Sequence, residues 1–149
     1  MTEIRFYHLE RQTQEQVIPV ILTKALERGH RAILKMCDEA QVARMNDHLW
    51  NFNVGSFLPH GCEKDGNAEL QPIWITHSDE NPNKADVMIL SQGAEIEDPS
   101  KFDLCCEMLD GNDERAVLVA RERWKKYKEQ NFDLTYWQQN ENGSWEKKA

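Results

Sequence analysis

The sequence predicts a single α/β domain of 149 residues, with a mostly parallel sheet flanked by helices on both faces. Three observations lead to this fold class. Short apolar segments alternate with segments of helical periodicity from the N-terminus onward, which is the pattern of βαβ units. The length is that of one ordinary domain. No internal repeat, low-complexity tract or Pro/Ser-rich linker marks a domain boundary.

The first predicted elements are a strand, a helix and a second strand. Residues 4–9 are apolar and aromatic and predict a strand. The apolar side chains that follow recur at i, i+3, i+4 and i+7, the spacing of a helix. Pro19 suits only the first turn of a helix, so the regular part is expected to begin near Ile18 and to end at a left-handed Gly29. Residues 31–36 predict the second strand.

A second helix is expected after residue 38. Asp38 with Gln41 three residues later forms a capping box, and Val42, Met45 and Leu49 then lie on one helical face. Strand, helix, strand and helix in succession predict a βαβ start and therefore a parallel sheet.

The second half of the chain is less regular. Residues 51–70 hold three glycines and are expected to be an irregular excursion, followed by two short apolar runs at 72–76 and 86–90. Apolar and polar residues alternate over 102–108, which predicts a half-buried strand.

The C-terminal third predicts a long helix and a returning strand. The turn at 110–113 supplies a cap for a helix that runs from about residue 114 to 130. A last strand is expected at 133–138, and Asn142-Gly143 suits a hairpin turn into a frayed final strand.

Composition excludes several classes of protein. Acidic residues outnumber basic ones 26 to 18, which gives a net charge of −8. Because phosphate binding needs a basic surface, this balance argues against a protein that coats nucleic acid. No apolar run approaches the length of a membrane span, and the N-terminus lacks a signal-peptide pattern. We therefore expect a soluble cytoplasmic domain, monomeric on its own.

Little in the sequence supports catalysis, a metal or a cofactor. The four cysteines show no CxxC spacing and are expected to be reduced and mostly buried. His60 and Cys62, even with His77, do not complete a tetrahedral zinc site. No glycine-rich phosphate loop and no nucleophile motif occurs. We expect no metal and no cofactor.

The long helix carries the most informative pattern. Ala116, Ala120 and Tyr127 form one line that should face the sheet, with Val117 and Trp124 along its edge. Beyond Trp124, three cations follow one another at i, i+4 and i+7 on a single face, namely Arg121, Lys125 and Lys128. Such like charges repel, by some tenths of a kcal/mol per pair.

Two interpretations of this face remain open. One is an ordinary solvated helix whose charges keep the protein soluble. The other is a receptor for an acidic peptide tail, in which Arg121 binds a C-terminal carboxylate bidentately beside the apolar surface of Trp124. In that interpretation Lys125 and Lys128 attract further acidic residues.

At this helix the sequence resembles the chi subunit of bacterial DNA polymerase III. The resemblance rests on ARERWKKY at 120–127, on LWNFNVGSFLPHG at 49–61 and on FYHL at 6–9. The helix–Gly29–RAILKM passage and the FDLTYWQ stretch fall where that family has them, so the likeness spans nearly the whole chain.

The resemblance implies a Rossmann-like domain without catalytic activity that serves as a clamp-loader accessory subunit. Members of this family bind the acidic C-terminal tail of single-stranded DNA-binding protein and pair with a small psi subunit. The tail-binding positions correspond here to Arg121, Trp124 and Lys125, with Trp50 as a neighbouring surface aromatic. Many relatives have tyrosine at the position of Trp124, and some have lysine at that of Val117. Val117 and Lys128 are included because of helical geometry.

Other functions stay open from the sequence alone. A degenerate nucleotide-binding enzyme could use His60 or the acidic residues at 95–98, and single-stranded DNA could stack on Trp50 and Trp124. The sequence leaves the roles of Phe57, His60 and Cys62 undecided. Three further tryptophans are assigned to packing or to an unidentified partner surface, namely Trp74, Trp137 and Trp145.

Overall fold

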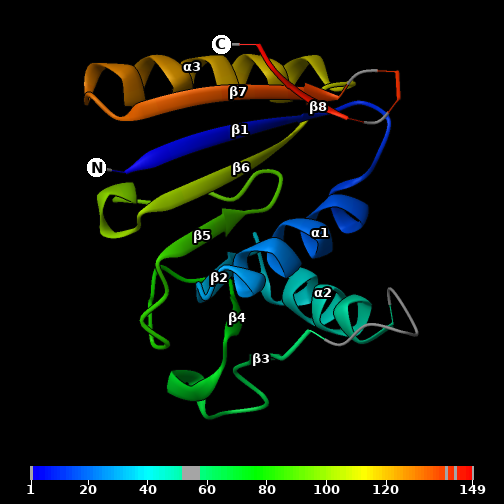
Figure 1. Ribbon diagram of the computed structural model, residues 1–149, viewed down its shortest axis with the longest axis vertical. Coiled ribbons are helices and arrows are strands. Elements are labelled where there is room, and N and C mark those ends of the chain that lie inside the picture. Colours follow the sequence, from blue (N-terminus) through cyan, green and yellow to red (C-terminus); the bar gives the residue numbers. More distant parts are fainter. Residues whose placement is uncertain (1, 52–57, 140, 143, 149) are drawn as a thin grey trace.

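The computed structural model describes residues 2–51, 58–139, 141–142 and 144–148. Within them, eight strands form one sheet in the order β3-β4-β2-β5-β6-β1-β7-β8. Every neighbouring pair in that described sheet is parallel except the antiparallel pair β7 and β8. The predicted α/β class with a mostly parallel sheet is confirmed (Figure 1).

The strands are β1 (Glu3–Leu9), β2 (Ala32–Lys35), β3 (His60–Cys62), β4 (Ile73–Thr76), β5 (Val87–Leu90), β6 (Leu104–Asp110), β7 (Asp133–Gln139) and β8 (Trp145–Lys147). The helices are α1 (Gln14–Glu27), α2 (Glu39–Asn51) and α3 (Glu114–Glu129), with short 3-10 turns η1 (Ala68–Leu70) and η2 (Pro99–Lys101).

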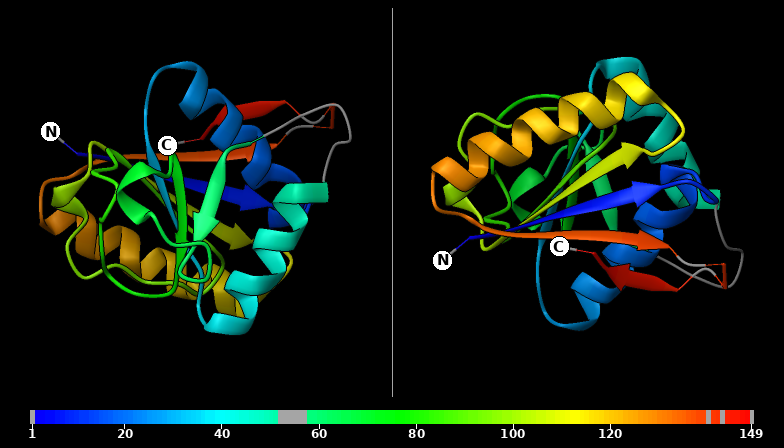
Figure 2. Two further views of the ribbon diagram at one scale, coloured as in Figure 1. Left: turned by 90° about the horizontal axis from the view of Figure 1, so that it is seen from below. Right: turned by 90° about the horizontal axis from the view of Figure 1, so that it is seen from above.

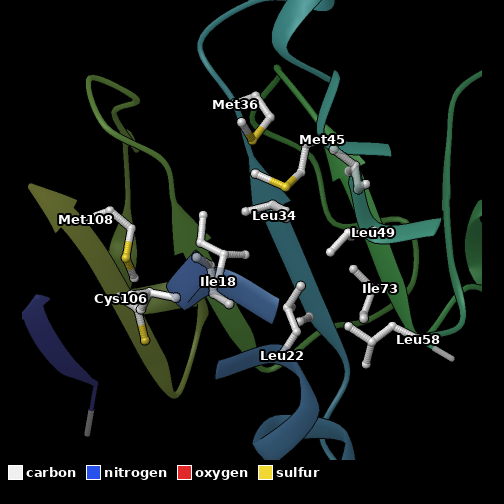
Figure 3. Packing of buried hydrophobic residues seen from close by; sticks show 14 of the residues in the cluster. Ile18, Leu22, Leu34, Met36, Met45, Leu49, Leu58, Ile73, Cys106 and Met108 are labelled. Carbon is white, nitrogen blue, oxygen red and sulfur yellow. The ribbon is translucent and has the colours of Figure 1, made fainter. Parts of the chain in front are cut away.

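The helices cover both faces of the sheet, as predicted. Helices α1 and α2 pack on one face, against a core that includes Leu34, Ile73 and Cys106 (Figure 3). Helix α3 packs on the other face over β6 and β7, against a second core that includes Phe6 and Leu109. The two views of Figure 2 place α1 and α3 on opposite sides of the sheet.

The order of the strands differs from a simple βαβ start. β1 and β2 are parallel members of one sheet, but β5 and β6 lie between them. The prediction correctly gives the direction of the strands. It cannot give their order, because periodicity identifies elements and carries no information about which strands are neighbours.

Helix α1 begins earlier than predicted, at Gln14 rather than near Ile18, so Pro19 lies in its interior. Proline has no N–H to donate to the carbonyl four residues before it, which is that of Glu15. The ring of His48 on α2 takes over this role, with Nε2 donating to the Glu15 oxygen at 2.5 Å. A tertiary contact therefore satisfies the carbonyl that the proline leaves unpaired.

The helix ends agree with the predicted capping residues. Gly29 follows α1 with φ of 81°. At α2, the Asp38 carboxylate accepts from the Gln41 backbone N–H at 2.8 Å, while the Gln41 side chain accepts from the N–H of Cys37 rather than of Asp38. The Asp113 carboxylate accepts from the backbone N–H groups of Arg115 and Ala116 and caps α3.

Two predictions about strands are wrong. Strand β6 is buried on both faces over residues 105–109, not half-buried, because α3 covers one face and α1 the other. Strand β3 lies within the segment expected to be irregular, where three residues pair with β4 at the edge of the sheet. Such a short strand leaves too few residues for a periodic signal.

Other predictions concern the chain termini and the cysteines. The final strand exists as β8, whereas Gly143 and Phe57 lie outside the described residues. All four cysteines are free, three of them buried and Cys37 exposed. Among the described residues, no helix combines the length and the apolar character that a membrane span requires.

Candidate functional site

The outer edge of α3 presents a cationic surface, here called the α3 ridge and defined as Val117, Arg121, Trp124, Lys125 and Lys128. Its first feature is the indole of Trp124. The indole packs edge-on against Phe6 of β1 at 5.5 Å and against Tyr136 of β7 at 6.1 Å between ring centroids. It is half-buried, so one part anchors the helix while the rest faces solvent.

The cations of the ridge are exposed and have few partners. Arg121 and Lys128 form no ion pair with any described residue. Lys125 approaches Glu122 at 4.0 Å, although both side chains are more than two thirds exposed. The Glu122 carboxylate weakens the positive charge at that end of the ridge. An exposed pair at this distance contributes little free energy.

Two of the three residues predicted to face the sheet are buried, whereas the third, Ala116, is only half-buried. Ala120 and Tyr127 are buried in the second core, and Val117 packs against the same core while remaining half-exposed. Val117 and Trp124 thus form the apolar border of the ridge, next to Arg121. The structure brings together five of the six predicted site residues.

Trp50 is the sixth, and the structure does not place it on this surface. It lies at the C-terminal end of α2, 54% exposed, with its ring 4.8 Å from that of His60. Helix α2 packs near β3 and β4 at the far edge of the sheet, on the face opposite α3. The expectation that Trp50 borders the helical cations is wrong, because its position in the sequence does not reveal on which face α2 packs.

Tyr136 is a residue of this surface that the sequence did not single out. Its hydroxyl is hydrogen-bonded to Nδ1 of His8, whose Nε2 lies 2.8 Å from a Glu10 carboxylate oxygen. Burial raises the pKa of Tyr136, while the positive charge of Arg121 lowers it in part. Alternation along β7 carries the signal that could have found this residue, because it places Leu134 and Tyr136 on the face that α3 covers.

A buried ion pair holds α3 onto the sheet. Arg123 pairs with Glu107 of β6, which is 3% exposed, and also donates to the Ala94 carbonyl at 3.1 Å. Burial raises the pKa of Glu107, although the charge of Arg123 opposes that shift. This pair orients α3 about its axis and so keeps Arg121 on the outer side.

The residues of the enzyme alternative have structural partners. His60 is buried, with Nδ1 donating to the Leu58 carbonyl at 2.6 Å. Glu95 lies 3.3 Å from Arg123, and Asp98 caps η2 through Ser100. Within the part of the chain that the structure describes, no three His, Cys, Asp or Glu side chains could together hold a metal ion.

Comparisons with known proteins agree on one family. The family model described as "DNA polymerase III chi subunit, HolC" matches residues 1–135. A DNA polymerase III subunit chi from Escherichia coli is 25% identical over 90% of this chain and 96% of its own length. That from Pseudomonas aeruginosa is 28% identical over 90% and 94%. A probable chi subunit from Rickettsia prowazekii is 27% identical over 64% of this chain and 58% of its own.

Proposed function

Since the chain belongs to the DNA polymerase III chi subunit family, we propose that its α3 ridge binds the acidic C-terminal tail of single-stranded DNA-binding protein. Arg121 receives the terminal carboxylate, and an aromatic side chain of the tail lies beside Trp124. The chain would act as a cytoplasmic, non-catalytic accessory subunit of the replicative polymerase.

One observation carries this proposal. Arg121 is exposed, stands beside a half-buried indole, and has no carboxylate partner among the described residues. A guanidinium in this setting can form a bidentate, charge-assisted contact with an external carboxylate. A short tail buries little surface and loses conformational freedom, so we expect a micromolar Kd, about −8 kcal/mol.

Fluorescence anisotropy with a labelled acidic peptide that ends in Asp-Phe tests the site. Arg121→Ala should weaken binding by at least about 2 kcal/mol, roughly 30-fold, because a charge-assisted contact is lost. The matched control is Arg115→Ala, which removes an exposed arginine from another face of the same helix and should leave the Kd unchanged. Equal affinities of the wild type and Arg121→Ala would exclude the site.

The same peptide with a C-terminal amide tests which group Arg121 contacts. Amidation should weaken binding to the wild type but have little further effect on Arg121→Ala, because both changes remove one interaction. Additive losses would show that Arg121 contacts another part of the tail.

A second part of the proposal rests on family membership alone. A psi-like subunit would connect this chain to the clamp loader. Co-expression of this chain with the psi subunit of its own organism should yield a complex that co-elutes in size-exclusion chromatography. Separate elution of the two chains at micromolar concentration would contradict it.

A further inference from the structure

A groove lies on the face of the sheet opposite the α3 ridge, between α1 and the β7–β8 hairpin. It encloses about 680 Å³. Its floor is formed by β1 and β6, with Tyr7 and Leu104 among the side chains, and Trp137 extends it onto β7. Its walls are α1, through Val20 and neighbouring residues, and β8, through Trp145. We refer to this feature as the α1 groove.

The α1 groove marks the part of the parallel sheet, at the beginning of β1 and β6 and on β7, that α1 covers only in part. Parallel sheets normally bury both faces under helices. On this face α1 packs over the second halves of β1 and β6, where Tyr7, Leu9 and Cys106 are buried, while β7 lies next to β1 on the side away from α1. The consequence is visible at the floor, where Trp137 is only half-buried and the Arg5 side chain is 30% exposed.

One end of the groove is positively charged. Arg5, Lys24, Arg28 and His30 line it, and among the described residues no aspartate or glutamate does. Arg5 is paired with Glu3 at 2.7 Å and His30 with Asp86. Lys24 and Arg28, by contrast, form no ion pair with any described residue. Two cations without counter-ions are thus concentrated at one place on a chain of net charge −8.

The other end of the groove is apolar and aromatic. Trp145 packs edge-on against Tyr7 with ring centroids 5.1 Å apart. Val20 is 52% exposed, and it shares one line of α1 with Lys24 and Arg28 at intervals of four residues. A ligand lying along α1 would therefore meet apolar side chains first and cations at the C-terminal end of the helix.

We infer that the α1 groove binds an amphipathic helix of another protein, with an apolar stripe and acidic residues toward one end. The wall of α1 from Val17 to Arg28 is about 17 Å long at 1.5 Å per residue, enough for about three helical turns. Such a helix would cover the partly exposed side chains of Arg5 on β1 and Trp137 on β7. Its acidic residues would neutralise Lys24 and Arg28, which a basic or neutral helix would leave unpaired.

Photo-crosslinking in the host cell tests this assignment. A benzophenone amino acid is placed at Val20, and as a matched control at Leu70, another exposed apolar residue that does not line the groove. We expect capture at position 20 only, and mass spectrometry should identify an acidic amphipathic helical segment. No capture above that at position 70, or capture of a basic segment, an extended segment or a second copy of this chain, would overturn the inference.

Titration with a synthetic peptide of the captured segment gives a second readout. The double variant Lys24→Gln, Arg28→Gln should weaken binding at least tenfold, while Arg44→Gln on α2 should not change it. An unchanged Kd in the double variant would overturn the inference that Lys24 and Arg28 bind the acidic residues of the partner.

The acidic tail peptide should bind the double variant and the wild type equally, because the groove and the α3 ridge lie on opposite faces. This comparison distinguishes a failure of the proposal for the α1 groove from a failure of the proposal for the α3 ridge.

Discussion

At the scale of single residues, the buried pair of Glu107 and Arg123 determines how α3 sits on the sheet. The Glu107 side chain is 4% exposed and that of Arg123 is 18% exposed. Taking two such charges out of water costs free energy that their attraction only partly offsets. The pair is therefore better explained as a device that orients α3 than as a source of stability.

Substitution of the pair tests this interpretation. Glu107→Ala should lower the free energy of unfolding by about 3–5 kcal/mol, because it leaves Arg123 without its buried partner. The double variant Glu107→Leu, Arg123→Met should recover most of that loss, since it removes both charges and keeps an apolar contact. Urea unfolding measures all three chains. A double variant as unstable as Glu107→Ala would contradict the interpretation.

The raised pKa of Glu107 predicts a dependence of stability on pH. The native chain holds this proton more tightly than the unfolded chain, in which a glutamate titrates near about 4.3. The stabilising contribution of this group is therefore complete at low pH and decreases as the pH rises through the raised value. The free energy of unfolding of the wild type minus that of Glu107→Gln should fall from about pH 4 upward. A difference that rises over this interval would contradict the prediction.

At the scale of elements, α1 and α2 are joined through an unusual contact. Pro19 lies inside α1 and has no N–H to donate to the Glu15 carbonyl, which instead accepts a hydrogen bond from His48. A proline in a helix interior normally costs about 3 kcal/mol, of which the missing hydrogen bond is one part. The contact to α2 restores that part and fixes how the two helices pack.

A double-mutant cycle tests this coupling. His48→Ala should destabilise the wild type, because the Glu15 carbonyl loses its donor. In a Pro19→Ala background the loss should be smaller by about 1 kcal/mol, since the alanine N–H can serve that carbonyl. Thermal or urea unfolding of the wild type, the two single variants and the double variant gives the coupling free energy between Pro19 and His48. Equal losses in both backgrounds would show that the contact does not replace the helical hydrogen bond.

The elements differ in how far the sequence predicts them. Strand β1 and helix α3 agree with their expected bounds to within a residue or so, because long periodic segments give a strong signal. The start of α1 was misplaced because the rule for Pro19 is local, whereas the compensation by His48 is tertiary. β3 was missed because three residues show no period.

Most residues of the α3 ridge could be predicted because they lie on one long periodic helix. Arg121, Trp124, Lys125 and Lys128 belong to one helix, so helical geometry alone brings them together. Tyr136 lies on a strand distant in sequence, and Trp50 on a helix of the opposite face, and such relations depend on strand order. The first was therefore missed and the second misplaced.

At the scale of the whole molecule, charge is unevenly distributed. The net charge is −8, yet six of the 18 basic residues lie between positions 115 and 128. An acidic body with a local basic surface favours a compact acidic ligand over a long polyanion, because the polyanion also meets the acidic surroundings.

The uneven distribution of charge should determine how binding depends on the salt concentration and on the kind of ligand. The labelled acidic tail peptide should bind more weakly as the salt concentration increases from about 50 to 300 mM, because exposed charges are screened. Oligo-dT should show no saturable binding at about 150 mM salt, measured by tryptophan fluorescence. Tight oligo-dT binding, lost in a Trp124→Ala variant, would favour direct recognition of single-stranded DNA.

The place of β1 in the sheet has a consequence for biosynthesis. β1 pairs with β6 on one side and with β7 on the other, and Glu3 lies in register with Leu104 and with Asp133. A ribosome that adds about 5–20 residues per second makes the first strand early and its two neighbours roughly 5–20 s later. Until then both edges of that strand are open to other chains. Nascent chains arrested before residue 100 should therefore depend on a chaperone to stay dispersed.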